Sequence, residues 1–104
     1  MRIALSLALV LVAAPASAAG ADPATGEHIA KTECATCHAI ARDAEAKSPD
    51  PKAPRFVDVA KMASTTELSL KVFLRSSHRN MPNFILSREE IDSLASYILE
   101  LGGK

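Results

Sequence analysis

The 104-residue sequence contains no tryptophan, only one tyrosine and only three phenylalanines. A domain this small with so few large side chains buries little surface, and it usually needs a disulfide, a metal or a cofactor to be stable. Its only cysteines, Cys34 and Cys37, lie so close together that a disulfide between them would hardly constrain the unfolded chain. We therefore expect a bound group to form part of the core.

An excess of charge of either sign is also missing. The chain has 12 lysines and arginines against 12 aspartates and glutamates, which gives a formal net charge of zero. A face that binds nucleic acid needs a strong excess of positive charge. We therefore expect no nucleic-acid partner.

Long hydrophobic runs are confined to the N-terminus. Residues 3–14 are almost all apolar, Pro15 follows them, and Ala16-Ser17-Ala18 matches a cleavage site. This pattern predicts a secretory signal peptide over residues 1–18, removed to leave a domain of residues 19–104. An uncleaved membrane anchor is the alternative, but it needs about 20 apolar residues. The rest of the sequence offers no further candidate span.

The central motif of the chain is Cys34-Ala35-Thr36-Cys37-His38. Two cysteines at this spacing lie about one helical turn apart on the same face, so both sulfurs can bond to one edge of a porphyrin. A histidine directly after the second cysteine completes the pattern of a c-type haem attachment site. We therefore predict that Cys34 and Cys37 form thioether bonds to one haem c, and that His38 is the proximal iron ligand.

Three other interpretations of the two cysteines remain open. A thioredoxin-like redox pair would need a βαβ pattern, which the sequence does not show. A structural zinc site would need four ligands, and the chain has no second pair of cysteines or histidines to complete one. A simple structural disulfide is the third.

The distal iron ligand is expected to be Met81, which lies 43 residues after His38. Pro82 holds the preceding residue in an extended conformation, which suits a side chain presented from a loop, and a methionine thioether raises the haem potential. Met62 is expected to fill the core instead. His78 is the serious rival ligand, whereas His28 is expected at the surface.

The remaining pattern predicts an all-α fold. Helices are expected over residues 24–33, 55–62, 64–76 and 87–101, since apolar residues recur there at helical spacing and no stretch alternates like a strand. Two sequences resemble capping boxes, Ser64-Thr65-Thr66-Glu67 and Ser87-Arg88-Glu89-Glu90. The last helix is the clearest one, with Ile91, Leu94, Ile98 and Leu101 on one face.

A proline-rich loop precedes the second predicted helix. Pro49, Pro51 and Pro54 lie within six residues, which excludes helix or central strand there. The free N–H of the His38 ring needs an acceptor, and the carbonyl of Pro54 is the candidate.

With these motifs in this order, the chain resembles class I cytochrome c, in its short bacterial, mono-haem, His/Met-ligated form. The resemblance implies a small cytochrome c fold of four to five short helices around one covalently bound haem. It implies that Gly26 packs against Tyr97 in the last helix, and that Ala53-Pro54-Arg55-Phe56 takes the place of the family's Gly-Pro-x-Leu segment. The sequence departs from the family at Ala30, where an aromatic residue is usual, so Ile29 or Phe73 would have to fill the crossing.

These features predict a periplasmic one-electron carrier, not an enzyme, that meets redox partners transiently as a monomer. A basic rim for an acidic partner is expected from Lys71, Arg75 and Arg79. The residues that anchor the haem propionates are not determined by the sequence, and the candidates are Arg55, Arg75 and Arg79. One alternative is a haem-based ligand sensor or weak peroxidase with a displaceable sixth ligand. Others are a dedicated subunit of a larger oxidoreductase and a thiol–disulfide module.

Overall fold

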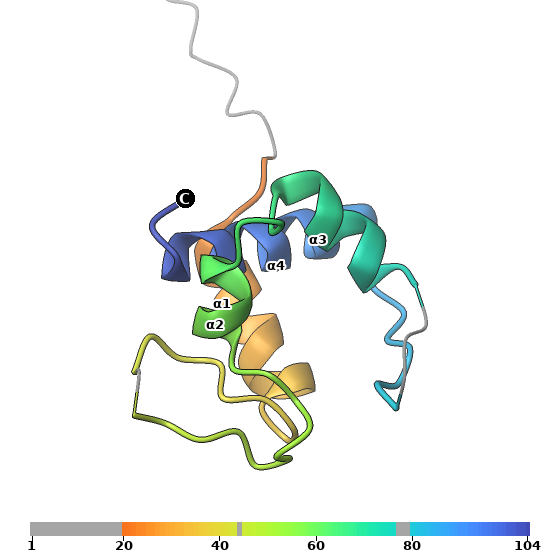
Figure 1. Ribbon diagram of the computed structural model, residues 1–104. Helices are drawn as coiled ribbons and strands as arrows, with labels where there is room; N and C mark the ends of the chain where they lie inside the picture. Colours follow the sequence, from red (N-terminus) through yellow and green to blue (C-terminus); the bar gives the residue numbers. More distant parts are fainter. Residues whose placement is uncertain (1–19, 44, 77–79) are drawn as a thin grey trace, which may run out of the picture.

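All elements in the described part of the chain are helices. The computed structural model describes residues 20–43, 45–76 and 80–104 (Figure 1). In chain order the elements are α1 (Pro23–Ile29), a short π-helix η1 (Ala30–Cys34), α2 (Phe56–Lys61), α3 (Glu67–Leu74) and α4 (Arg88–Leu101). The predicted all-α fold is confirmed, although the first predicted helix divides into an α-helical and a π-helical part.

The longest helix, α4, organises the fold, because α1, α2 and α3 all pack against it (Figure 1). Its predicted capping box is present, with Ser87 Oγ accepting from Glu90 N and Glu90 accepting from Ser87 N. Its apolar face is buried as predicted, and the core there consists of Ile91, Leu94, Ile98 and Leu101, joined by Ala95 and Tyr97.

The crossing of α1 over α4 is the closest contact of the fold. Asp22 caps α1 by accepting from the first backbone N–H groups, and its own N–H donates to Ser93 Oγ on α4 at 3.1 Å. A Cβ atom on Gly26 would lie 2.0 Å from the Ser93 carbonyl oxygen and 2.8 Å from Tyr97 Cβ. Only glycine therefore allows this approach, and the predicted packing of Gly26 on Tyr97 is confirmed.

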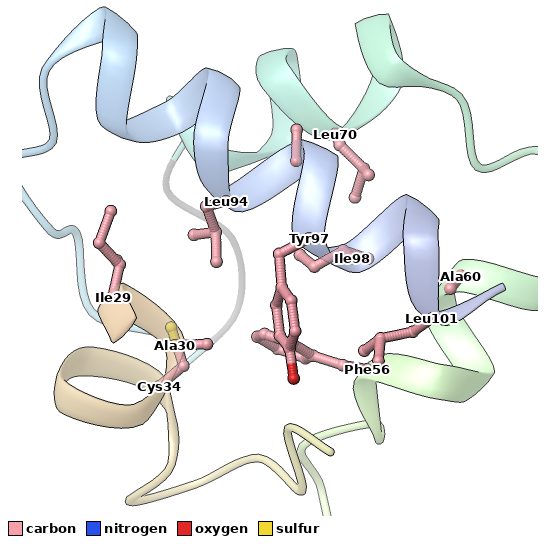
Figure 2. Packing of buried hydrophobic residues seen from close by; sticks show 11 residues of the cluster. Ile29, Ala30, Cys34, Phe56, Ala60, Leu70, Leu94, Tyr97, Ile98 and Leu101 are labelled. Carbon is pink, nitrogen blue, oxygen red and sulfur yellow. The ribbon is translucent and has the colours of Figure 1, made fainter. Parts of the chain in front are cut away.

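Next to this crossing, Ala30 is fully buried without an aromatic side chain, and Ile29 is buried beside it, at 7% exposed. Figure 2 shows both residues in the cluster beneath α4, together with Leu94 and Cys34. Phe73 is 51% exposed and does not fill the space. Of the two candidate compensating residues, Ile29 is the one in the core.

Helix α3 differs from the prediction at its start. The capping box is formed by Thr66 and Ser69, not by Ser64 and Glu67. Thr65 is buried, with its hydroxyl donating to the Val59 carbonyl at 2.6 Å, so the turn after α2 uses the residues that were expected to begin the helix.

Leu70 is the one buried residue of α3, although several other residues of this helix are apolar. Leu70 is 5% exposed, whereas Leu68, Val72 and Phe73 are 72%, 57% and 51% exposed. Leu70 packs in one core cluster with Leu94 and Ile98 of α4, so the contact with α4 decides which side of α3 is buried. Lys71 adds an ion pair with Asp92 of α4 at 3.0 Å. The spacing of apolar residues within α3 alone therefore cannot predict which side of the helix is buried.

Met62 ends α2 and is 50% exposed, so the expectation that it fills the core is wrong. The helix stops at Lys61, and Met62 is already extended, which turns its side chain out of the packed face. No helix in the described part of the chain is long and apolar enough to cross a membrane.

Candidate haem site

The π-helix η1 places the first cysteine of the motif inside the protein. Its widened turn is closed by a hydrogen bond from Ala35 N to Ala30 O at 3.0 Å, five residues back. Cys34 is 7% exposed and Cys37 is half-buried. Burial raises the pKa of the Cys34 thiol to about 11. Before haem is attached, burial thus favours the neutral thiol of Cys34 over the thiolate.

A tight turn follows η1 and brings His38 back toward the same segment. Cys37 N and His38 N both donate to the Cys34 carbonyl, at 3.1 and 2.9 Å. The motif therefore has a defined backbone conformation, in which both cysteines and the histidine lie within one turn of each other.

The His38 ring is held by two neighbours. Its Nδ1 lies 2.6 Å from the Pro54 carbonyl oxygen, as expected for the acceptor. Because a carbonyl only accepts, Nδ1 is the protonated nitrogen, and Nε2 keeps the lone pair that a metal needs. The ring of Phe56 packs against the imidazole, with the ring centroids 5.1 Å apart and tilted by 49°.

Phe56 was not expected from the sequence to have this role. The sequence feature that could have predicted this role is its position two residues after Pro54. Since the Pro54 carbonyl lies next to His38, a side chain so close to Pro54 in the chain can also reach the imidazole. Phe56 is 6% exposed, so the contact with His38 is part of the core.

The proline-rich loop is fastened to the motif, and the residues just after the motif are fastened to α2 and α4. Asp50 N donates to the Cys37 carbonyl at 3.1 Å, and Phe56 N donates to the Ala39 carbonyl at 2.9 Å. Tyr97 reaches from α4, as Figure 2 shows. Its hydroxyl donates to the Ile40 carbonyl at 2.7 Å. This second role of Tyr97 has no sequence signal beyond the residue type.

Met81 and Cys34 line the same cavity, although they are far apart in the sequence. Most of the other side chains around it are apolar, among them Leu74, Phe84 and Leu94. The cavity thus joins the motif, α3, α4 and the loop after α3. Its volume is only about 20 Å³, and His38 is not among the residues that line it, so the structure brings Cys34 and Met81 to one cavity but not the complete set of predicted haem contacts.

The other candidate residues lie elsewhere. His28 is exposed on α1, as expected. His78 and Arg79 lie outside the described residues. Arg55 forms a two-pronged ion pair with Asp58, through Nε and Nη2 at 2.7 Å each. Among the part of the chain that the structure describes, no three histidine, cysteine, aspartate or glutamate side chains are grouped so that they could hold a metal ion.

Lys71 is not a free member of a basic rim. Its ammonium group pairs with Glu67 on its own helix and with Asp92 on α4. The hydrogen bond that Lys71 donates to Glu67, and then the one it donates to Asp92, raise the pKa of Lys71. The lysine therefore holds α3 to α4, and the basic rim expected from the sequence loses one of its three charges.

These residues fit a covalently held haem. Two sulfurs one turn apart, an imidazole with a free Nε2 and an apolar cavity with a thioether in its wall form the donor set that haem c requires. The fold and the site define a small c-type cytochrome.

The comparisons with known proteins agree. The chain belongs to the family described as cytochrome c oxidase, cbb3-type, subunit III, whose model matches residues 21–98. It is also similar to cytochrome c-552 of Bradyrhizobium diazoefficiens, with 36% identity over 94 residues, which cover 90% of this chain and 88% of that protein. No solved structure matches the chain. The protein is thus a class I c-type cytochrome, an electron carrier that binds haem c covalently, as the sequence predicts.

Proposed function

We propose that this protein is an exported one-electron carrier in which Cys34 and Cys37 hold the haem, and His38 and Met81 are the two axial ligands. The observation that carries the proposal is the cavity whose wall contains both Cys34 and Met81. When bound, haem c supplies an iron that changes by one electron between its ferrous and ferric states.

The residues of this chain have distinct tasks in that role. The Pro54 carbonyl accepts the Nδ1 proton of His38 and so directs Nε2 at the iron. Phe56 limits rotation of the imidazole. Met81 offers a soft sulfur, which favours the ferrous state and raises the potential. If His38 and Met81 both bind the haem iron, the chain would leave no position for a substrate, so we propose electron transfer without catalysis.

Met81 can be tested against a matched methionine. Met81→Ala should abolish the weak methionine–iron charge-transfer band of the oxidised protein, and the reduced protein should then bind carbon monoxide rapidly. Met62→Ala should leave both properties unchanged, because Met62 is half-exposed at the end of α2. A Met81→Ala protein that keeps the band would show that another side chain is the ligand. Rapid carbon monoxide binding by the unaltered protein would favour the sensor or peroxidase alternative.

We also propose that residues 1–18 are a cleaved signal peptide and that the protein works in the periplasm as a monomer. The apolar run of residues 3–14 and the small residues after it support this. Cell fractionation and N-terminal sequencing test it. A periplasmic protein that begins at or within two residues of Ala19 is expected, and a protein that keeps Met1 would contradict the proposal.

A second candidate function is that of a dedicated subunit of an oxidoreductase. It is favoured by the match to a family described as an oxidase subunit. A carrier meets its partners through small, transient contacts, whereas a subunit stays bound. Mild affinity purification from membranes distinguishes the two, since only a subunit should elute in constant ratio with other chains.

A further inference from the structure

A second hollow lies beside the haem cavity. It is lined by the end of α1, by Thr32 and Glu33 of η1, by the loop before α4 and by Glu90 of α4, and it has a volume of about 370 Å³. We call this hollow the outer groove. Glu33, Phe84 and Leu86 line both the outer groove and the cavity that contains Cys34 and Met81. These three residues therefore form a common wall, and a molecule in the outer groove is separated from the cofactor cavity by one layer of side chains.

The outer groove carries an apolar side chain that the fold does not use. Ile85 is fully exposed, at 102%, between the partly buried Phe84 and Leu86. Leu86 packs against the core, so the chain is held on that side and Ile85 points outward. A single exposed isoleucine is ordinary on a protein surface, but Phe84, Ile85 and Leu86 together give the groove a continuous apolar stretch, and such a patch is typical of a contact surface.

The charge of the outer groove is negative. Glu33 is exposed at one side, and Glu90 at the other is fixed by the hydrogen bond that its Oε2 accepts from Ser87 N at 2.7 Å. Among the described residues that line the groove there is no lysine or arginine, and His28 is the only nitrogen base. The charge is opposite to that of the basic rim expected from the sequence.

We infer that the outer groove is the docking surface for a redox partner that presents an apolar side chain surrounded by lysines or arginines. The inference rests on the proposed function of the protein as an electron carrier. The apolar part of the partner would contact Ile85 and Phe84, while its cations would face Glu33 and Glu90. Electrostatic attraction of this kind mainly raises the rate of encounter, and salt weakens it.

A test uses the reduced holoprotein and two inorganic oxidants. Tris(phenanthroline)cobalt(III) is an apolar cation, and ferricyanide is a polar anion. In each reaction one electron passes from the protein to the oxidant, and no proton is transferred. The cobalt complex is reduced from cobalt(III) to cobalt(II), and ferricyanide is reduced from iron(III) to iron(II). Stopped-flow absorbance measures both rates as a function of ionic strength.

The variants are Ile85→Lys and Glu33→Gln, each of which raises the charge of the groove by one unit. Each should slow oxidation by the cobalt complex about fivefold at low ionic strength, and the effect should shrink as salt is added. Oxidation by ferricyanide should be unchanged or faster. Poly-L-lysine, which offers the surface chemistry of a basic protein, should slow the cobalt reaction of the unaltered protein but not that of Ile85→Lys.

Ala41→Lys and Glu45→Gln are the matched controls, since they change the charge equally in the loop after His38. Arg42 in that loop donates to the Glu100 carbonyl at the far end of α4, about 15 Å along the helix from Glu90. Both controls should react within about twofold of the unaltered protein. Equal effects of groove and control variants would overturn the inference.

Two further outcomes remain decisive. If Glu33→Gln fails to take up haem because it precedes Cys34, Ile85→Lys decides alone, since its fully exposed side chain is not needed for folding. A protein that lacks the spectrum of a six-coordinate haem would refute the proposed function. An intact spectrum with rates that do not respond to the groove variants would refute only the docking surface.

Discussion

The substitution Gly26→Ala tests the crossing on which the site is built. The new Cβ would lie 2.0 Å from the Ser93 carbonyl oxygen and 2.6 Å from its carbon. Both are backbone atoms, so no change of rotamer can relieve the contact. Helix α1 would have to move away from α4, and the hydrogen bond from Asp22 N to Ser93 Oγ would be lost.

The expected cost follows from three terms. Overpacking a tight contact costs about 1–3 kcal/mol, and the lost hydrogen bond about 1 kcal/mol. Alanine in place of glycine within a helix raises the free energy of unfolding by about 1 kcal/mol, because alanine has the higher helix propensity. The net loss in the free energy of unfolding is then about 1–3 kcal/mol. For a domain of this size each kcal/mol lowers Tm by about 4–8 °C, so we expect a fall of about 4–24 °C.

Thermal melts of the oxidised holoprotein, followed by circular dichroism and by haem absorbance, measure this fall. Gly103→Ala is the control, because Gly103 has a φ of 73° but a Cβ atom there would meet no other atom within 4 Å. Its cost is confined to backbone strain of about 1–2 kcal/mol. A Gly26→Ala protein that melts within about 3 °C of the unaltered one would refute the packing argument.

Three further predictions concern the motif and the N-cap. Phe56→Leu should lower Tm by several degrees and alter the low-spin electron paramagnetic resonance signal, since the imidazole loses a ring that limits its rotation; an unchanged signal would contradict this role. The hydroxyl of Thr25 is the main group that lowers the pKa of Asp22, so this cap stabilises α1 above about pH 4 and the stabilisation is lost as the pH falls further. Asp22→Ala should therefore melt lower at pH 7, and the difference should narrow below about pH 4; a constant difference would speak against it. Cys34→Ser/Cys37→Ser, which cannot attach haem, should lack a sharp cooperative melt in calorimetry, and a sharp one would show that haem is not part of the core.

The features that could be read from the sequence are those in which the chemistry is local. Cys34, Cys37 and His38 are neighbours in the chain, and their spacing alone predicts what they hold. The capping box at Ser87 and the apolar stripe of α4 depend on residues within one or two turns. The Pro54 acceptor could be predicted because a histidine that binds metal needs a partner for its second nitrogen, and a carbonyl in the stiff proline-rich loop can serve.

Only the tertiary structure decided the features that depend on a second helix. The N-cap of α3 is Thr66 and not Ser64 as predicted, because Thr65 is buried in the turn after α2 and donates to the Val59 carbonyl. Lys71 was expected in a surface rim, yet Asp92 of α4 lies where its ammonium group can reach. The negative outer groove arises because Glu33 and Glu90 come from different helices. Sequence periodicity describes one helix at a time, whereas burial and charge at a surface are set by the helix that packs beside it.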